Sequence, residues 1–394
     1  MAIKKKRWGL SIVFIILGLC LGGSLILALV NLSVPQKSSN PGQLSDVDVA
    51  YVLEVQQFHE ELGNEVFPGL GERTIPVILY NEEYAFLIGM KNPSAGWVKV
   101  PQEQQRGDVW QPMPAVETFP QLTYYRSTYD PQRGPDAFTV RVGESYVSSM
   151  PTKEWFKISL MDNFRTGLPS FIKPIFPYSL AANLFLPNTD TYLSLIHHES
   201  FHAFQAVWAP QRFTQAELDG IQIQDQYPWE NETGAKAWKI ELTLLQTALQ
   251  TDNSEETKIL VQKFLDQRES RRILMNLSPD LIRYENQREW VEGMARYSEL
   301  ESWRLASGDD QYQPLKNLEI DSNFKNYDSF GIRWKRELEQ IVRMANDEGD
   351  GRFYYSGMAQ AFLLDRLYPS WKEILASDPM FNLEDLLKQA LIEK

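Results

Sequence analysis

The sequence predicts an α+β protein with a single N-terminal transmembrane helix, followed by a mixed β-sheet and a mainly helical second half. Three observations lead to this prediction. Residues 8–30 form an uncharged apolar run, and short segments rich in Val, Ile, Thr and Tyr fill the first half of the chain. In the second half, apolar residues recur at three- and four-residue steps, as amphipathic helices require. A chain of 394 residues is also long enough to bury a large core.

The apolar run predicts a membrane anchor. Residues 8–30 contain no charged side chain, and their length exceeds the roughly 20 residues that a helix needs to cross a bilayer. Four basic residues at 4–7 precede the run, which predicts a cytoplasmic tail over 1–7 and an extracytoplasmic location for the rest of the chain. A long, cleaved signal peptide is the alternative, and it gives the body of the protein the same location.

A linker and a sheet-containing subdomain are expected next. Residues 31–48 are polar and rich in Ser, Pro, Asn and Gly, which is typical of a linker. An N-terminal α/β subdomain is expected over 49–187, beginning with a helix at about 49–62. Prolines interrupt the apolar segment 169–187, so we expect it to line a cleft or to pack beneath the sheet. The strands are predicted at 74–80, 95–100, 121–128, 137–143 and 155–161.

Helical patterns predict a second, helical subdomain over 188–394. Its first helix begins after Asn188, a cap-type residue, and ends before Pro210. A later helix begins at Ser278 and Pro279, because Ser is a favoured cap and Pro is favoured at the first helical position. Further helices are expected at 236–250, 255–275, 331–346, 355–367 and 381–392.

Composition excludes several classes of function. The net charge of −13 makes the chain a poor partner for nucleic acid phosphates. Neither a GxxxxGK[ST] nor a GxGxxG phosphate loop is present. The one cysteine, Cys20, lies in the apolar run, so the chain can form neither an internal disulfide nor a thiolate metal site downstream.

Three of the four histidines lie together, and two of them form a metal-binding motif. His198, Glu199 and His202 fit H-E-x-x-H. Four residues are just over one helical turn, so both imidazoles lie on one face and can bind one ion. Glu199 is rotated about 100° from His198, where it can reach a metal-bound water and act as general base. The alternative is a pair of ordinary core or surface histidines.

The other two histidines are expected to have lesser roles. His197 is adjacent to His198 and cannot share the ligand face, so we expect it to support the site indirectly or to be exposed, and to be dispensable. His59 lies far away in sequence and is expected to be structural.

A catalytic zinc site usually takes three protein ligands, and no histidine follows His202. Residues 290–299 read WVEGMARYSE, which resembles the W-x-E-G-x-A-x-Y-x-E segment of gluzincin-type zinc metallopeptidases of the thermolysin-like superfamily. In that family the Glu before Gly is the third zinc ligand, so the resemblance implies Glu292. Glu232 remains the alternative, because Glu292 follows His202 by 90 residues, more than is common in the family.

The chain also departs from the family near this segment. Arg296 stands where thermolysin has an aspartate that supports the site, so Glu299 or Glu289 would have to take over that role.

A tyrosine completes the expected site. Residues 354–357 read YYSG and resemble the Y-x-x-G-A segment of aminopeptidase-type gluzincins, whose Tyr hydrogen-bonds the oxyanion of the transition state. The resemblance implies Tyr354 in that role, with Tyr355 and Tyr297 as alternatives.

These residues together predict a membrane-anchored zinc metallopeptidase that acts on a peptide or protein. His198, His202 and Glu292 would bind Zn²⁺, Glu199 would activate water and Tyr354 would assist. A catalytically inactive, membrane-tethered binding or assembly factor on a zincin-like fold is the alternative from another class, and zinc-dependent hydrolysis of a non-peptide bond is a third. The sequence does not indicate the oligomeric state.

Overall fold

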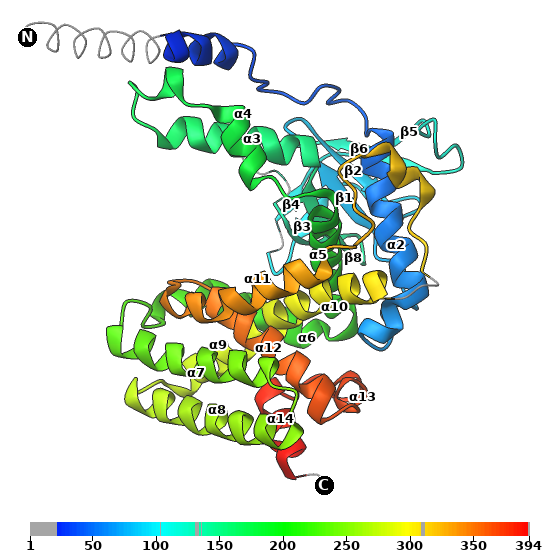
Figure 1. The fold of residues 1–394 in the computed structure, drawn as a ribbon. Helices are drawn as coiled ribbons and strands as arrows, with labels where there is room; N and C mark the ends of the chain where they lie inside the picture. The colour runs from blue at the N-terminus through cyan, green and yellow to red at the C-terminus, as the bar shows by residue number, and fades with distance from the viewer. Residues whose placement is uncertain (1–21, 103, 131–133, 135, 309–311, 393–394) are drawn as a thin grey trace, which may run out of the picture.

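The computed structural model describes residues 22–102, 104–130, 134, 136–308 and 312–392. Figure 1 shows the sheet and helix α2 (Asp46–Val66) in one half of the molecule, and helices α7 (Glu232–Gln250), α8 (Ser254–Leu274) and α14 (Leu383–Ile392) in the other. Helix α5 (Thr189–Trp208) lies between the two halves and contacts both the sheet and α10 (Met294–Gly308).

The described strands form one mixed sheet in the order β4-β3-β7-β8-β1-β2-β6-β5. Strands β1 and β8 are parallel, with Val77 opposite Ser148, and all other neighbours are antiparallel. Four of the five predicted strands are confirmed, and β2, β4, β5 and β8 were not predicted. The strands are β1 (Val77–Tyr80), β2 (Tyr84–Ile88), β3 (Trp97–Lys99), β4 (Gln105–Arg106), β5 (Gln111–Met113), β6 (Tyr124–Thr128), β7 (Phe138–Val142) and β8 (Ser145–Pro151).

The central strands are buried on both faces, and alternate residues of each strand point to opposite sides of the sheet. In β1, Val77 and Leu79 belong to the main core, which also contains residues of α2, α5 and the helices of the second half. Ile78, between them, belongs to a smaller core on the other face together with Trp97 and Trp110.

The predicted strand at 155–161 is wrong, because this segment lies in helix α3 (Lys153–Gly167). The Thr152 side chain accepts a hydrogen bond from the Trp155 backbone N–H and caps the helix. The buried residues Ile158 and Met161 are three apart, so they lie on one helical face. The aromatic and β-branched content of the segment favoured a strand, but this three-residue spacing of the buried side chains is helical.

The proline-rich segment 169–187 does not pack beneath the sheet, but Leu186 near its end lines a cavity, in keeping with the other alternative. It forms the short helix η2 (Lys173–Ile175) and α4 (Tyr178–Phe185), which packs against α3. Tyr178 and Ala182 share a small separate core with α3, whereas Leu180 and Leu184 are exposed.

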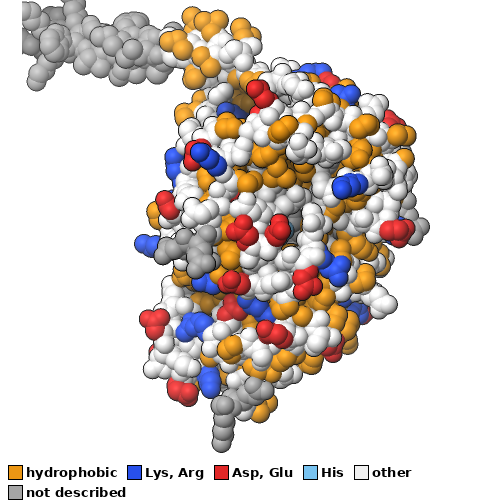
Figure 2. Space-filling view, turned by 90° about the vertical axis from the view of Figure 1, so that its right-hand side faces the viewer, with side chains coloured by type: hydrophobic (Ala, Val, Ile, Leu, Met, Phe, Trp, Pro, Cys, Tyr) orange, Lys and Arg blue, Asp and Glu red, His pale blue; other side chains and the backbone are white. Residues whose placement is uncertain are grey.

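The predicted transmembrane helix, and with it the single-pass membrane localisation, is contradicted. Within the part of the chain that the structure describes, no helix is both long and apolar enough to cross a membrane. Residues 8–21 of the predicted span lie outside the described residues, and the rest of it belongs to a helix over 22–31, which is too short by itself. Figure 2 shows hydrophobic side chains on the surface of this helix.

The second half of the chain is helical, as predicted. Asn188 caps α5 by accepting from the Thr191 N–H, and Ser278 caps α9 by accepting from the Leu281 N–H. The remaining elements are α6 (Pro210–Gln222), η3 (Gln224–Gln226), α9 (Pro279–Arg288), the π-helix η4 (Glu289–Gly293), η5 (Lys316–Ile320), α11 (Phe330–Arg343), η6 (Met344–Asn346), α12 (Gly351–Leu367) and α13 (Trp371–Ser377).

A buried network of ion pairs joins α7, α8, α9 and α14. Arg271 on α8 lies 2.5 Å from a carboxylate oxygen of Glu241 and 3.1 Å from one of Glu285. Arg272 contacts Glu285 at 2.8 Å and Glu384 at 2.9 Å. Each of these charges is desolvated, so each depends on its partners to remain buried.

We expect Arg271→Met to lower the free energy of unfolding by about 3–5 kcal/mol, because it leaves two buried carboxylates without their main partner. Arg343→Met is the matched control. Arg343 is exposed, and its ion pair with Glu339 is long, at 4.0 Å. Its loss should therefore lower the free energy of unfolding by less than about 1 kcal/mol. Urea denaturation followed by circular dichroism measures both, and equal effects of the two changes would contradict a stabilising role for the network.

Candidate metal centre

The two histidines of the H-E-x-x-H motif lie on one face of helix α5, with their rings close together. The Nε2 atoms of His198 and His202 lie 3.1 Å apart. The Gln205 side chain donates from Nε2 to the Trp290 carbonyl at 2.7 Å, so its Oε1 accepts from Nδ1–H of His202, 3.0 Å away. This contact leaves His202 Nε2 with a free lone pair, which is the form that binds a metal.

His198 is oriented by a carboxylate. Its Nδ1 lies 3.4 Å from Glu299 Oε2. Glu299 is wholly buried and is held by Arg296 and Arg333. Burial alone would raise the pKa of Glu299, but Arg296 and its other partners hold it well below the ordinary value. Arg296 therefore does not replace the expected aspartate itself. It holds Glu299, whose carboxylate lies beside His198.

Glu292 lies on the π-helix η4 and brings a carboxylate to the two imidazoles. Its Oε2 is 3.3 Å from His202 Nε2 and 3.8 Å from His198 Nε2. Its Oε1 accepts a hydrogen bond from Arg288 Nη2 at 2.6 Å, whereas the buried Oε2 has no hydrogen-bond partner among the described residues. Arg288 thus neutralises one oxygen and leaves the other directed at the histidines.

These three side chains could hold a metal ion. One ligand atom from each of His198, His202 and Glu292 lies within 4.8 Å of the other two, and all three residues are buried. In a tetrahedral site with bonds of 2.0–2.1 Å, neighbouring ligand atoms are about 3.3 Å apart, close to the separations found here. Burial alone would lower the pKa of His198, yet Glu292 and Glu299 raise it to about 10, so the site favours a positive charge.

Two glycines explain how Glu292 reaches the histidines. A Cβ atom at Gly293 would lie 2.5 Å from Gly357 Cα, and one at Gly357 would lie 2.5 Å from the Glu289 carbonyl oxygen. The backbones of η4 and α12 therefore touch at this crossing, which no larger residue permits. The same approach brings Tyr354, one turn before Gly357, to the metal residues.

A cavity of about 180 Å³ opens beside His202 and Glu292 and is also lined by Glu199, Tyr354 and residues of β7 and α6. The Tyr354 ring is nearly parallel to that of His198, with centroids 5.9 Å apart. Burial, opposed by the two histidines, raises the pKa of Glu199. The alternative tyrosines serve elsewhere, because Tyr355 donates to Glu337 and Tyr297 donates to Asp365.

The structure does not bring the rival carboxylates to the site. Glu232 is exposed at the first turn of α7. Glu289 is buried but binds Arg268 and Ser356. Sequence analysis missed two supporting residues, Arg288 and Gln205. Their helical spacing was the available signal, since Arg288 precedes Glu292 by four residues and Gln205 follows His202 by three.

His197 is not exposed, contrary to one of the roles expected for it. It is buried, with Nδ1 2.8 Å from Nε2 of His59 and Nε2 2.7 Å from Ser298 Oγ. Burial lowers the pKa of both histidines, to about 3 for His59. His197 thus joins α2, α5 and α10 as a neutral side chain, and His59 is the structural residue that we expected.

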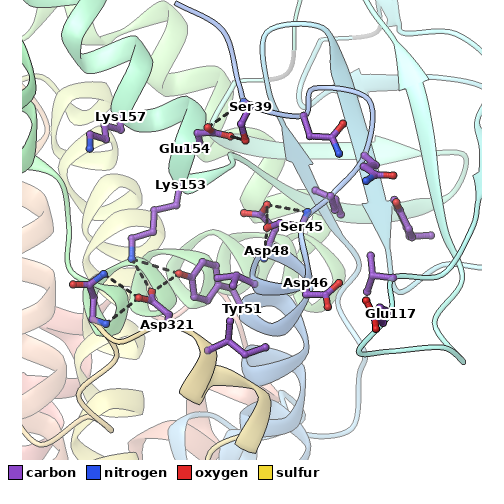
Figure 3. A pocket seen from close by; sticks show the side chains of 18 of the residues that line it. Ser39, Ser45, Asp46, Asp48, Tyr51, Glu117, Lys153, Glu154, Lys157 and Asp321 are labelled. Carbon is purple, nitrogen blue, oxygen red and sulfur yellow. Dashed lines mark hydrogen bonds and ion pairs between the residues drawn. The ribbon is translucent and has the colours of Figure 1, made fainter. Parts of the chain in front are cut away.

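A larger cavity of about 900 Å³ lies between α2, α3 and η5, and several of its charged side chains are paired with neighbouring residues (Figure 3). Lys153 Nζ contacts Asp321 at 3.3 Å, and the Asp321 carboxylate also accepts from the Tyr51 hydroxyl. Glu154 accepts from Ser39, and Asp48 accepts from Ser45. No histidine is among the described residues that line this cavity, whereas two of the three residues that could hold a metal line the smaller one.

No known protein family, curated protein or solved structure matches this chain. The likeness to gluzincins therefore depends on the motif residues alone.

We expect Gly357→Ala to separate α12 from η4 and to weaken zinc binding at least about tenfold, because it displaces the support of a ligand. Overpacking should also destabilise the fold by about 1–3 kcal/mol. A competition titration with a chromophoric chelator measures the affinity. Gly331→Ala on α11 is the control, since a Cβ there meets nothing within 4 Å. Unchanged zinc affinity in Gly357→Ala would show that the glycine contact does not position Glu292.

Proposed function

We propose that this chain is a zinc-dependent metallopeptidase of the gluzincin type. The observation that carries the proposal is that Glu199 and Tyr354 face the same cavity as His202 and Glu292. A purely structural metal site needs neither a base nor a hydroxyl donor beside its ligands. Zinc is the preferred ion, because two imidazoles and one carboxylate with an open position match its catalytic sites.

The bound ion would supply a Lewis acid that polarises the substrate carbonyl and acidifies a water molecule. Glu199 supplies the general base, because its carboxyl group reaches the cavity that His202 and Glu292 also line. After the attack, the same carboxyl group can pass its proton to the leaving amine.

Tyr354 supplies a hydrogen-bond donor for the oxyanion that forms on the substrate. Burial and the neighbouring Glu292 carboxylate raise its pKa well above the ordinary value, so the hydroxyl keeps its proton at neutral pH. Arg288, Gln205 and Glu299 bind no substrate in this mechanism. They hold the ligand atoms in place, so that little reorganisation accompanies the reaction.

We expect Glu199→Gln to lower peptide hydrolysis at least about 10²-fold, because it removes the proton acceptor. Zinc stoichiometry should remain that of the wild type, since Glu199 is not a ligand. A fluorogenic peptide library measures hydrolysis, and mass spectrometry measures bound zinc. Glu232→Gln, which changes an exposed carboxylate outside the site, should behave as the wild type in both.

Full peptide hydrolysis by Glu199→Gln would exclude this mechanism. A cellular role that survives the substitution unaltered would instead indicate a binding or assembly function.

A further inference from the structure

The cavity beside the metal centre contains a carboxylate that the proposed reaction does not use. Glu217 on α6 lines this cavity, and only 8% of the residue is exposed. Its nearest cation is Arg288, whose Nη1 is 3.5 Å from Glu217 Oε1. Arg288 makes much shorter contacts to Glu292 at 2.6 Å and Asp350 at 2.7 Å. The Arg288 guanidinium therefore contacts three carboxylates, and its contact with Glu217 is the longest of the three.

A second polar group in the same cavity lacks a partner. Thr139 on β7 lines the cavity and is 2% exposed, and its Oγ1 forms no hydrogen bond within the described part of the chain. A buried hydroxyl without a partner is costly, and a bound group would relieve that cost. Phe138 and Phe213 form apolar walls of the same cavity. The lining thus combines aromatic sides with a carboxylate and a hydroxyl.

We propose that this cavity is a specificity pocket for a positively charged nitrogen of the substrate peptide. The aromatic walls would contact an alkyl stem, as the side chains of Lys and Arg provide. The Glu217 carboxylate would accept hydrogen bonds from the cationic end, and Thr139 Oγ1 would accept another. The volume of about 180 Å³ suits one side chain or one amino terminus. The proposal rests on the proposed function, because it takes the occupant to be a peptide.

Binding to the zinc-free protein tests this without relying on catalysis. Peptides that differ only by Lys or norleucine at one position, with blocked termini, are titrated into chelator-treated wild-type protein by calorimetry. We expect the Lys peptide to bind at least about tenfold more tightly, as a charged hydrogen bond to a buried group implies. Peptides with a free amino terminus form a second arm, which distinguishes a terminal amine from a side chain as the source of the charge.

Glu217→Gln keeps the shape of the side chain and removes its charge, so the preference for the cation should fall to less than about twofold. Thr139→Val keeps the β-branched shape and removes the hydroxyl, and it should reduce the preference about threefold. The second variant provides an independent test if Glu217→Gln does not fold. Glu232→Gln is the charge-matched control and should keep the full preference.

The proposal is overturned if neither the Lys peptide nor a free amino terminus binds better than its neutral counterpart, or if both variants keep the preference. The two proposals fail separately. Peptide cleavage without a cation preference contradicts the specificity pocket alone. Preferential binding of cationic peptides by a zinc-loaded protein that cleaves none of them contradicts the metallopeptidase alone.

Discussion

The candidate metal centre depends on how the two oxygens of the Glu292 carboxylate are used. Arg288 binds one oxygen of Glu292, and the other oxygen faces two imidazole nitrogens without a donor of its own. Three potential ligand atoms converge there in a buried place, and their neighbouring carboxylates raise the pKa of His198, so the site favours a cation, either a proton or a metal ion. The surrounding residues maintain this convergence. Gln205 and Glu299 fix the imidazoles, while the contact between η4 and α12 fixes the carboxylate.

The buried ion pairs of the helical second half also hold the π-helix that contains Glu292. Arg268 on α8 binds Glu289, which lies on the same π-helix as Glu292. Ser356 on α12 also donates to Glu289, so three elements meet at this one carboxylate. Helices α7 and α8 account for much of the long separation between His202 and Glu292. These helices therefore help to hold Glu292 in place, through the buried ion pairs that connect them to its π-helix.

Local patterns predicted the parts of the structure that depend on local spacing. The one-turn separation of His198 and His202 predicted a shared helical face, and the caps at Asn188 and Ser278 predicted helix starts, because these features are set within a few residues. Glu292 was reached through a resemblance, since spacing alone could not choose it over Glu232. The segment 155–161 was misassigned because its strand-like composition outweighed the helical spacing of its buried residues. The composition of the apolar run predicted a membrane span, but none of the described helices is long and apolar enough to be one.

The remaining features could not be predicted, because they arise from contacts between distant segments. The π-helix η4 packs against α12, and the hydroxyl of Thr139, which has no partner among the described residues, faces a cavity that residues of α6 also line. Likewise, the ion pair between Arg296 and Glu299 is related to the site only through the fold, which places Glu299 beside His198.

X-ray absorption spectroscopy at the zinc edge, on the full chain loaded with one equivalent of Zn²⁺, examines this centre most directly. A His198–His202–Glu292 site predicts about four nitrogen or oxygen scatterers at roughly 2.0–2.1 Å, with the multiple scattering of two imidazoles. A zinc shell without imidazole scattering, or folded protein that retains no zinc, would contradict the site described above.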